Sequence, residues 1–318
     1  MVSRVRAVAA RLAWAALTFV AVAALTFLTP RVLRPDYYPG QGVVSGVLHD
    51  LERLFFHFDL GRAWLWAGSP EISVMLQRNF EADLWLLGGA MLIGVGSGVV
   101  GGLWCAARRR SLASRLLEGS AMLLYCTPVY VLGLLLLLAF NPIFGSWPLP
   151  AFFEAEPIWA RPWSEPWDWF RTLLVPWLVL AAPIGAMVLR LTLATVIESL
   201  DEDYVRTAYG KGLGSRRVIL RHAAPSSYVT TASFVAVSIP LIVSNMVLVE
   251  RVLSVPGFFR FTWKALGHIE PMPEFHTRDY PMLQAMTLWG AFLIIVSGLI
   301  LDAVLHRLDP RIRASTAS

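Results

Sequence analysis

The residues that could carry chemistry in this sequence are few and widely spaced. No two of its six histidines have the spacing H-x-x-x-H or H-E-x-x-H, which brings two zinc ligands to one face of a helix. The sequence has no G-x-S-x-G turn to present a nucleophilic serine. Its two cysteines, Cys105 and Cys126, lack the spacing of a metal site. We therefore expect no metal site, no catalytic residues and no enzyme.

Two glycine-rich stretches resemble nucleotide-binding motifs, but their context argues against that use. GSGVVG, residues 96–101, fits G-x-G-x-x-G, yet it lies inside a long apolar segment and does not follow a strand. Gly94, Gly98 and Gly102 recur every four positions, which favours close helix packing in lipid. Lys211 is flanked by glycines, but the G-x-x-x-x-G-K-[ST] spacing of a phosphate-binding loop is missing. We expect no cofactor bound by this chain.

The stretch DYVRTAYGKGLGSRRVILRHAAP, residues 203–225, is polar and lies between two apolar segments. Ser199 and Glu202 have the spacing of a capping box, and Asp203 adds negative charge in the first turn, so a helix should begin near residue 200. Apolar residues at helical spacing would form a stripe along it. These are Leu200, Tyr204 and Ala208.

Three glycines, Gly210, Gly212 and Gly214, should end this helix after about three turns. Ser215 can cap a second helix that ends or bends at Pro225. The product would be a small basic wedge. It could be a basic loop that only enforces topology, or a surface on which a partner docks. Topology alone does not require a cap, an apolar stripe and three glycines, so the pattern favours a docking wedge.

The elements that position this wedge are long apolar segments. Hydrophobic residues make up 56% of the chain and charged residues 15%, which is typical of a membrane protein. A helical span needs about 20 mainly apolar residues. Six segments qualify: residues 12–28, 84–104, 120–140, 173–195, 230–249 and 282–305. The predicted fold is all-α, a polytopic membrane protein with six transmembrane helices.

The positions of Lys and Arg near the spans predict the orientation. Arginines cluster in the N-terminal tail, at Arg108–Arg110, in the wedge and in the C-terminal tail, whereas the opposite loops are richer in acids. This bias predicts that both termini and the wedge are cytoplasmic. We expect a first helix and external loop over 1–82, a core over 83–306 with a cytoplasmic loop at 196–228, and a tail over 307–318.

The external segments are rich in aromatic residues. Residues 31–83 mix Tyr, Phe and Trp with charges, and residues 147–170 place five tryptophans among five prolines. Such tryptophans are most often anchors at the membrane interface or part of an amphipathic helix on the bilayer surface. The alternative is a docking surface for an external partner.

The wedge resembles the coupling loop of the membrane-spanning permease subunits of bacterial ATP-binding cassette importers. RTAYGKGL is similar to the R-T-A-x-x-K-G-L form of the dipeptide, oligopeptide and nickel branch, and the spacing from Gly212 to Pro225 agrees with the family motif. Further similar segments are FDLGRAW, TPVYVLGLLLLL, RDYPMLQ and LDPRIR. The resemblance implies the transmembrane fold of a type I importer, in a bacterial inner membrane.

The resemblance also implies partners and roles. A second permease would complete the path for peptides or similar small solutes, two ATPase subunits would bind ATP and Mg, and an external solute-binding protein would deliver the solute. The ATPase would contact residues of the wedge, with a docking face at Tyr204, Thr207 and Ala208, charges at Arg206 and Lys211, and a turn at Gly212. The implied docking residues are Asp203, Tyr204, Arg206, Thr207, Ala208, Gly210, Lys211, Gly212 and Pro225. No nucleic-acid partner is expected.

The translocation path is less marked in the sequence. Asn245, Met246 and Glu250 are candidates, because polar groups at membrane depth usually face a cavity or the bundle interior. Asn245 could instead bridge two helices. Two other functions stay open: a secondary transporter driven by an ion gradient, and a membrane subunit that docks a cytoplasmic partner without flux. We find no convincing intramembrane carboxylate pair or inverted repeat, which such a carrier usually has.

Overall fold

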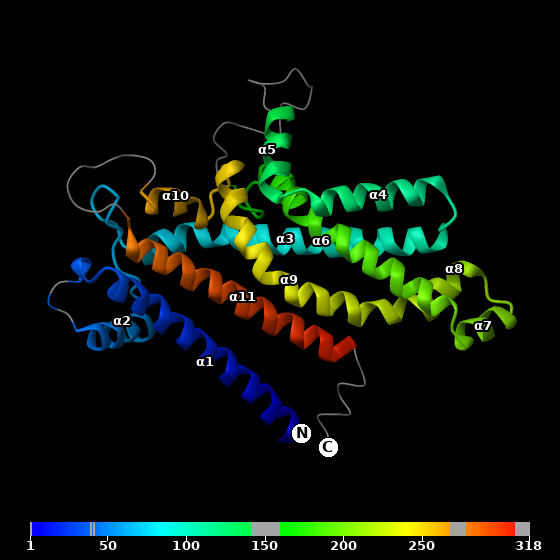
Figure 1. Cartoon of the computed structure of the whole chain (residues 1–318), viewed down its shortest axis with the longest axis horizontal. Helices are drawn as coiled ribbons and strands as arrows, with labels where there is room; N and C mark the ends of the chain where they lie inside the picture. Colours follow the sequence, from blue (N-terminus) through cyan, green and yellow to red (C-terminus); the bar gives the residue numbers. More distant parts are fainter. Residues whose placement is uncertain (1, 39, 41, 141–159, 268–277, 309–318) are drawn as a thin grey trace. The chain divides into compact units, whose positions relative to one another are not determined.

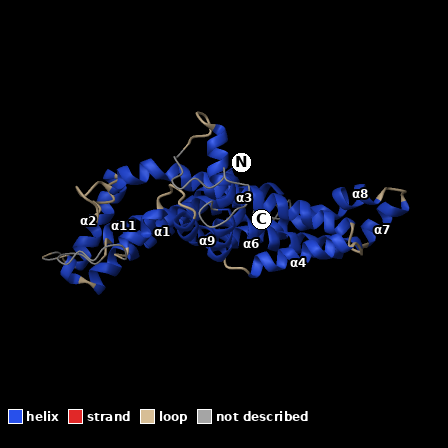
Figure 2. Ribbon diagram, turned by 90° about the horizontal axis from the view of Figure 1, so that it is seen from above, coloured by secondary structure: helices blue, strands red, loops and turns tan. Residues whose placement is uncertain are grey.

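The computed structural model describes residues 2–38, 40, 42–140, 160–267 and 278–308. Over these ranges the chain is helical, and its only extended pairing is one isolated bridge between Arg62 and Glu71 (Figures 1 and 2). The predicted all-α fold is confirmed. The described chain divides into two compact units, residues 2–83 with 256–299 and residues 84–255 with 300–308.

Five helical segments are long and apolar enough to cross a membrane. They lie in α1 (Val2–Leu33), α3 (Ile72–Ala107), α6 (Pro166–Leu200), the segment Ser215–Val252 and α11 (Tyr280–Leu308). The third predicted span corresponds to two helices, α4 (Leu112–Cys126) and α5 (Val129–Phe140), which meet at 106°. Counting this bent pair as one span gives the predicted six.

The prediction of one continuous helix over 120–140 is wrong because of the Thr127–Pro128 step. Proline disfavours helical dihedrals in the residue before it, and Thr127 is extended, with φ −82° and ψ 124°. Pro128 has no N–H to continue the ladder of α4. Its carbonyl instead accepts from Leu132 N–H at 3.1 Å, which starts the first turn of α5.

In the first unit, α1 packs against α2 (Val43–His57) and α11 through Ala23, Phe27, Leu54 and Leu288. Helix α2 is an amphipathic helix within residues 31–83, which agrees with the expectation of such a helix in the external segments. Arg31 near the end of α1 holds α2 in place. It is 4% exposed and forms an ion pair of 2.8 Å with Asp50 of α2.

Two buried carboxylates join distant segments within the first unit. Asp83 accepts from Phe258 N–H at 2.9 Å and from the Trp289 indole N–H at 2.6 Å. Asp279 accepts from Leu65 N–H at 2.9 Å and from Met282 N–H at 3.1 Å. Hydrogen bonds to charged groups contribute about 1.5–3 kcal/mol each, so these acids fix the loops of the unit to α11.

In the second unit, α6 is the most buried helix and packs against α4 and α9 (Ala224–Val252). The predicted glycine packing is confirmed, because a Cβ at Gly98 would lie 2.6 Å from Val188 Cβ, and one at Gly102 would lie 2.7 Å from Leu189 O. Residues 141–159 and 268–277, which hold most of the tryptophan- and proline-rich segment and the stretch before RDYP, lie outside the described residues, as does the tail from 309.

Candidate functional site

The predicted wedge begins with α7 (Asp203–Gly210), which follows the end of α6 after two residues. The predicted capping box is wrong. Ser199 belongs to the last turn of α6, where its Oγ donates to Thr195 O at 2.9 Å and lies 2.5 Å from Ser226 Oγ. The N-cap of α7 is Glu202, and its side chain makes no capping hydrogen bond.

The glycine turn after α7 is a Schellman motif, which closes a helix with a left-handed residue. Gly212 N–H donates to Tyr209 O at 2.9 Å, and Leu213 N–H donates to Ala208 O at 3.3 Å. Gly212 has φ +80°, a conformation that costs side-chain-bearing residues about 1–2 kcal/mol. The prediction that Gly212 permits the turn is therefore supported by its geometry, whereas Gly210 lies inside α7.

The second helix of the wedge differs from its prediction. Its N-cap is Gly214, so Ser215 is its first residue and not its cap. Helix α8 (Ser215–Val218) continues through a π-helical turn, Ile219–Ala223, into α9 without ending at Pro225. In this turn Ala224 N–H donates to Ile219 O, five residues back. Pro225 is therefore accommodated by the π-helical turn directly before it, which shifts the hydrogen-bond register without ending the helix.

The two faces of the wedge are not the ones predicted. Val205, Ala208 and Val218 are buried together, and Leu200 and Leu213 pack on them. Tyr204 is 49% exposed, so the predicted stripe of Leu200, Tyr204 and Ala208 is wrong by one position: the buried residue is Val205. Ala208 supports the wedge from inside. The exposed face of α7 carries Asp203, Tyr204, Arg206 and Thr207.

The charges on α7 are weakly paired. Arg206 lies 3.7 Å from Asp203, and both side chains are largely exposed, so this ion pair contributes little to stability. The hydroxyl of Thr207 donates back to Asp203 O at 2.9 Å. Lys211, at the C-cap, is exposed and extends from the turn. The face that α7 presents is therefore polar, compact and held by a core of its own.

The three residues proposed for a path lie on α9. Met246 and Glu250 are fully buried within the second unit, and Asn245 is partly exposed. In this arrangement only Asn245 reaches the surface of the unit. All three residues lie close together on α9 and are distant from α7 in the sequence.

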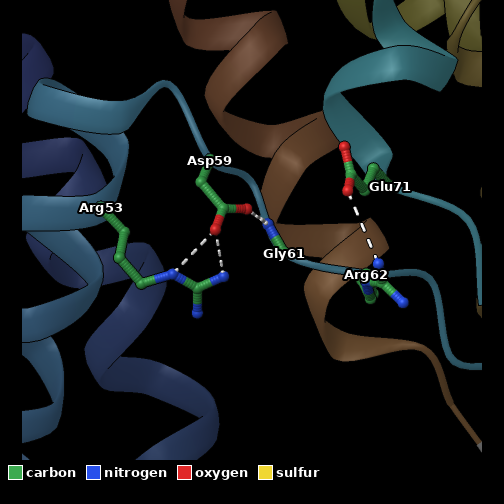
Figure 3. A network of polar contacts seen from close by, with 5 residues as sticks. All are labelled: Arg53, Asp59, Gly61, Arg62 and Glu71. Carbon is green, nitrogen blue, oxygen red and sulfur yellow. Dashed lines mark hydrogen bonds and ion pairs between the residues drawn. The ribbon is translucent and has the colours of Figure 1, made fainter.

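A second polar site, which the sequence reasoning did not single out, lies in the first unit (Figure 3). Arg53 donates from Nε and Nη2 to one oxygen of Asp59, at 3.0 and 2.5 Å, and Gly61 N–H donates to the other at 2.8 Å. Burial raises the pKa of Asp59, but the hydrogen bonds from Arg53 and Gly61 outweigh it and lower that pKa below its ordinary value. In the sequence this site is marked by the segment FDLGRAW, which contains Asp59 and Gly61. In the structure Gly61 has φ +86°.

Among the residues that the structure describes, no three His, Cys, Asp or Glu side chains group closely enough to hold a metal ion. The arrangement combines long apolar helices with an exposed helix–turn–helix wedge between α6 and α9. These features define the class of the chain as a multi-pass helical membrane protein with a protruding loop.

Comparison with known proteins identifies the family. The family described as "Binding-protein-dependent transport system inner membrane component" matches residues 98–314, more than half of the chain, so the chain belongs to this family. It is therefore a permease subunit of a membrane transport system, and a multi-pass inner-membrane protein.

Several curated relatives match over most of their length. The chain is 29% identical to "Probable peptide ABC transporter permease protein y4tP" of Sinorhizobium fredii, over 79% of this chain and 75% of that protein. It is 28% identical to "Oligopeptide transport system permease protein OppB" of Mycobacterium tuberculosis, over 78% and 74%. It is 26% identical to "Dipeptide transport system permease protein DppB" of Bacillus subtilis, over 77% and 72%.

Proposed function

We propose that this chain is one of two permease subunits of an ATP-driven importer for peptides or similar small solutes. The names of the relatives support this substrate class, since they are peptide, oligopeptide and dipeptide permeases. An external solute-binding protein would deliver the solute, and two cytoplasmic subunits would bind ATP and Mg. The chain itself would move the solute without covalent chemistry.

The observation that carries the coupling role is the separate core of the wedge. Val205, Ala208 and Val218 pack together, so α7 is held as a rigid body whose polar face is exposed. A lever must keep its shape when a partner pushes on it, and a loop that only enforced topology would not require this core.

We place the contact with the ATPase on the exposed residues of α7, chiefly Tyr204, Arg206 and Thr207. Asp203 and Lys211 supply charge at the two ends of the helix, and Ala208 and Gly212 act from within by holding the shape. The segment Ser215–Val252 continues from the wedge as one helical segment. Motion of the wedge would therefore pass directly into α9, which carries Asn245, Met246 and Glu250, and would switch the spans between two states as a rigid-body movement.

Reconstituted transport tests the proposal. Proteoliposomes would contain this chain, a second permease, the two ATPase subunits and a peptide-binding protein. We expect peptide uptake that requires ATP and is blocked by vanadate. Uptake that follows a proton gradient without ATP would instead identify a secondary transporter. A stable complex that hydrolyses ATP but moves no solute would identify a docking subunit.

A further inference from the structure

A basic concavity lies where the wedge meets the turn between α3 and α4, within the second unit. It has a volume of about 390 Å³, and every charged residue that lines it is an arginine. Its polar lining residues are Arg108, Arg109, Arg110, Ser111, Tyr209 and Ser215. The first four come from the turn after α3, and the last two from the wedge. Two segments about a hundred residues apart in sequence thus enclose one hollow.

The arginine turn is held in place by its own hydrogen bonds. Ser111 N–H donates to Arg108 O at 2.8 Å, and the Ser111 hydroxyl caps α4 by accepting from Ser114 N–H at 3.1 Å. The Arg108 guanidinium lies over the Trp104 ring, 5.1 Å from its centroid. The backbone that carries Arg109 and Arg110 is therefore fixed before any ligand arrives.

The described residues do not neutralise the positive charge of this hollow. In the part of the chain that the structure describes, neither Arg109 nor Arg110 forms an ion pair, and both are exposed. Arginine forks match phosphate oxygens in geometry as well as charge. The hydroxyls of Tyr209 and Ser215, 3.4 Å apart, add further hydrogen-bonding groups. The ligand that fits this lining is a phosphate group.

The position of the hollow indicates where the phosphate comes from. The arginine turn directly follows the last residue of α3, one of the five apolar segments long enough to cross a membrane. The next helix exposes Leu112 and Leu116, 65% and 64%, at a spacing that places them on one face. Basic pockets at this level on the cytoplasmic side bind anionic headgroups, and exposed leucines beside them suit acyl chains.

We propose that this hollow binds the phosphate headgroup of an anionic phospholipid of the cytoplasmic leaflet. The headgroup contacts Arg109 and Arg110 on one side and the hydroxyls of Tyr209 and Ser215 on the other. It thereby ties the wedge to the end of α3. The binding step does not depend on ATPase docking, so the two proposals can fail separately.

Native mass spectrometry of the full chain measures this binding directly. The detergent-purified protein is titrated with phosphatidylglycerol and, separately, with phosphatidylcholine. We expect tight retention of phosphatidylglycerol only. The variant R109Q/R110Q should bind it about 30-fold more weakly, since each arginine's hydrogen bonds to the phosphate contribute roughly fivefold. R109K/R110K, which keeps both charges but loses the forked geometry, should bind phosphatidylglycerol with an affinity between those of the wild type and R109Q/R110Q.

A matched control removes two arginines from the same predicted side of the membrane. R6Q/R11Q should lower the affinity less than about threefold, because neither residue lines the hollow. Equal losses of lipid affinity in R109Q/R110Q and R6Q/R11Q would show that only general surface charge matters, and this would overturn the proposed site. Unchanged binding by R109Q/R110Q would also overturn it.

Two further arms separate the source of the phosphate and the competing partner. Inorganic phosphate should not displace the lipid at comparable concentration, and displacement would assign the hollow to a soluble anion. Added ATPase subunits should leave the lipid bound. Release of the lipid by these subunits would assign the hollow to the protein interface and overturn the lipid site.

Discussion

The left-handed residue at Gly212 gives the sharpest test of the wedge geometry. A Cβ at Gly212 or at Gly210 would meet no atom within 4 Å, so steric contacts do not distinguish the two positions. Their backbones differ, because Gly212 has φ +80° and Gly210 is the last residue of α7. The same substitution at the two positions therefore isolates the cost of the backbone conformation.

The two alanine substitutions should change the stability of the wedge in opposite directions. Gly212→Ala costs about 1–2 kcal/mol because alanine disfavours the left-handed region, and Gly210→Ala gains up to about 1 kcal/mol of helix propensity. The difference of about 1–3 kcal/mol corresponds to roughly 5- to 150-fold in the opening equilibrium of the wedge. Gly212→Asn should fall between them, since asparagine tolerates this region better.

Hydrogen exchange of the wedge amides reads this equilibrium directly. The informative amide is that of Leu213, which donates to Ala208 O across the Schellman turn. We expect faster exchange there in Gly212→Ala and unchanged or slower exchange in Gly210→Ala. The amount of solute transported per ATP hydrolysed should be lower in Gly212→Ala than in Gly210→Ala. Equal exchange in the two alanine variants would refute the assignment of the turn.

Three further predictions concern the rest of the chain. Gly98→Ala should destabilise the second unit by about 1–3 kcal/mol, because its Cβ would overlap Val188 and Gly185 O. Gly96→Ala, with open space around it in the same helix, should leave the thermal midpoint in detergent unchanged or slightly raised; equal midpoints in the two variants would contradict the helix contact. Asp83→Asn should cost about 1–3 kcal/mol, because Phe258 N–H and the Trp289 indole N–H donate to different oxygens of Asp83, and in asparagine one of these oxygens becomes an NH2 group that cannot accept. A tryptophan fluorescence spectrum and midpoint identical to the wild type would argue against this role. The ion pair of Asp59 should stabilise the first unit fully above the ordinary carboxyl pKa of 3.8, and this contribution should be lost as the pH falls through the lower folded-state pKa. Arg53→Gln should therefore weaken the loss of stability at acid pH in a profile of stability against pH, and an unchanged acid part of that profile would contradict the assignment.

The apolar segments were predictable from the sequence because lipid requires each span to satisfy its own backbone hydrogen bonds. Hydropathy reports that requirement directly, so five segments agree with helices in the structure. The bend at Thr127–Pro128 was missed because hydropathy does not register backbone dihedrals. The Thr-Pro pair was visible and would have indicated it.

The wedge was predictable as an element, but its faces were not. The three glycines correctly located the turn. Of the three, Gly212 is the one that needs a left-handed backbone. Capping boxes and helical stripes depend on where a helix starts, and α6 continues through Ser199. The shift of the helix start moved the buried position from Tyr204 to Val205. The Arg53–Asp59 pair depends on the left-handed residue Phe58 that ends α2, a conformation that hydropathy does not register. The arginine hollow requires contacts between two segments about a hundred residues apart, which spacing along the chain does not encode.

Site-directed cross-linking tests the central claim that the exposed face of α7 touches an ATPase subunit. Cys105 and Cys126 are first replaced by serine, and single cysteines are introduced as Thr207→Cys and, for comparison, Val205→Cys. In a complex that hydrolyses ATP, a short bifunctional thiol reagent should join Thr207→Cys to the ATPase subunit. It should not join Val205→Cys, which is fully buried in the wedge. A complex that hydrolyses ATP yet gives no product at Thr207→Cys would contradict the account.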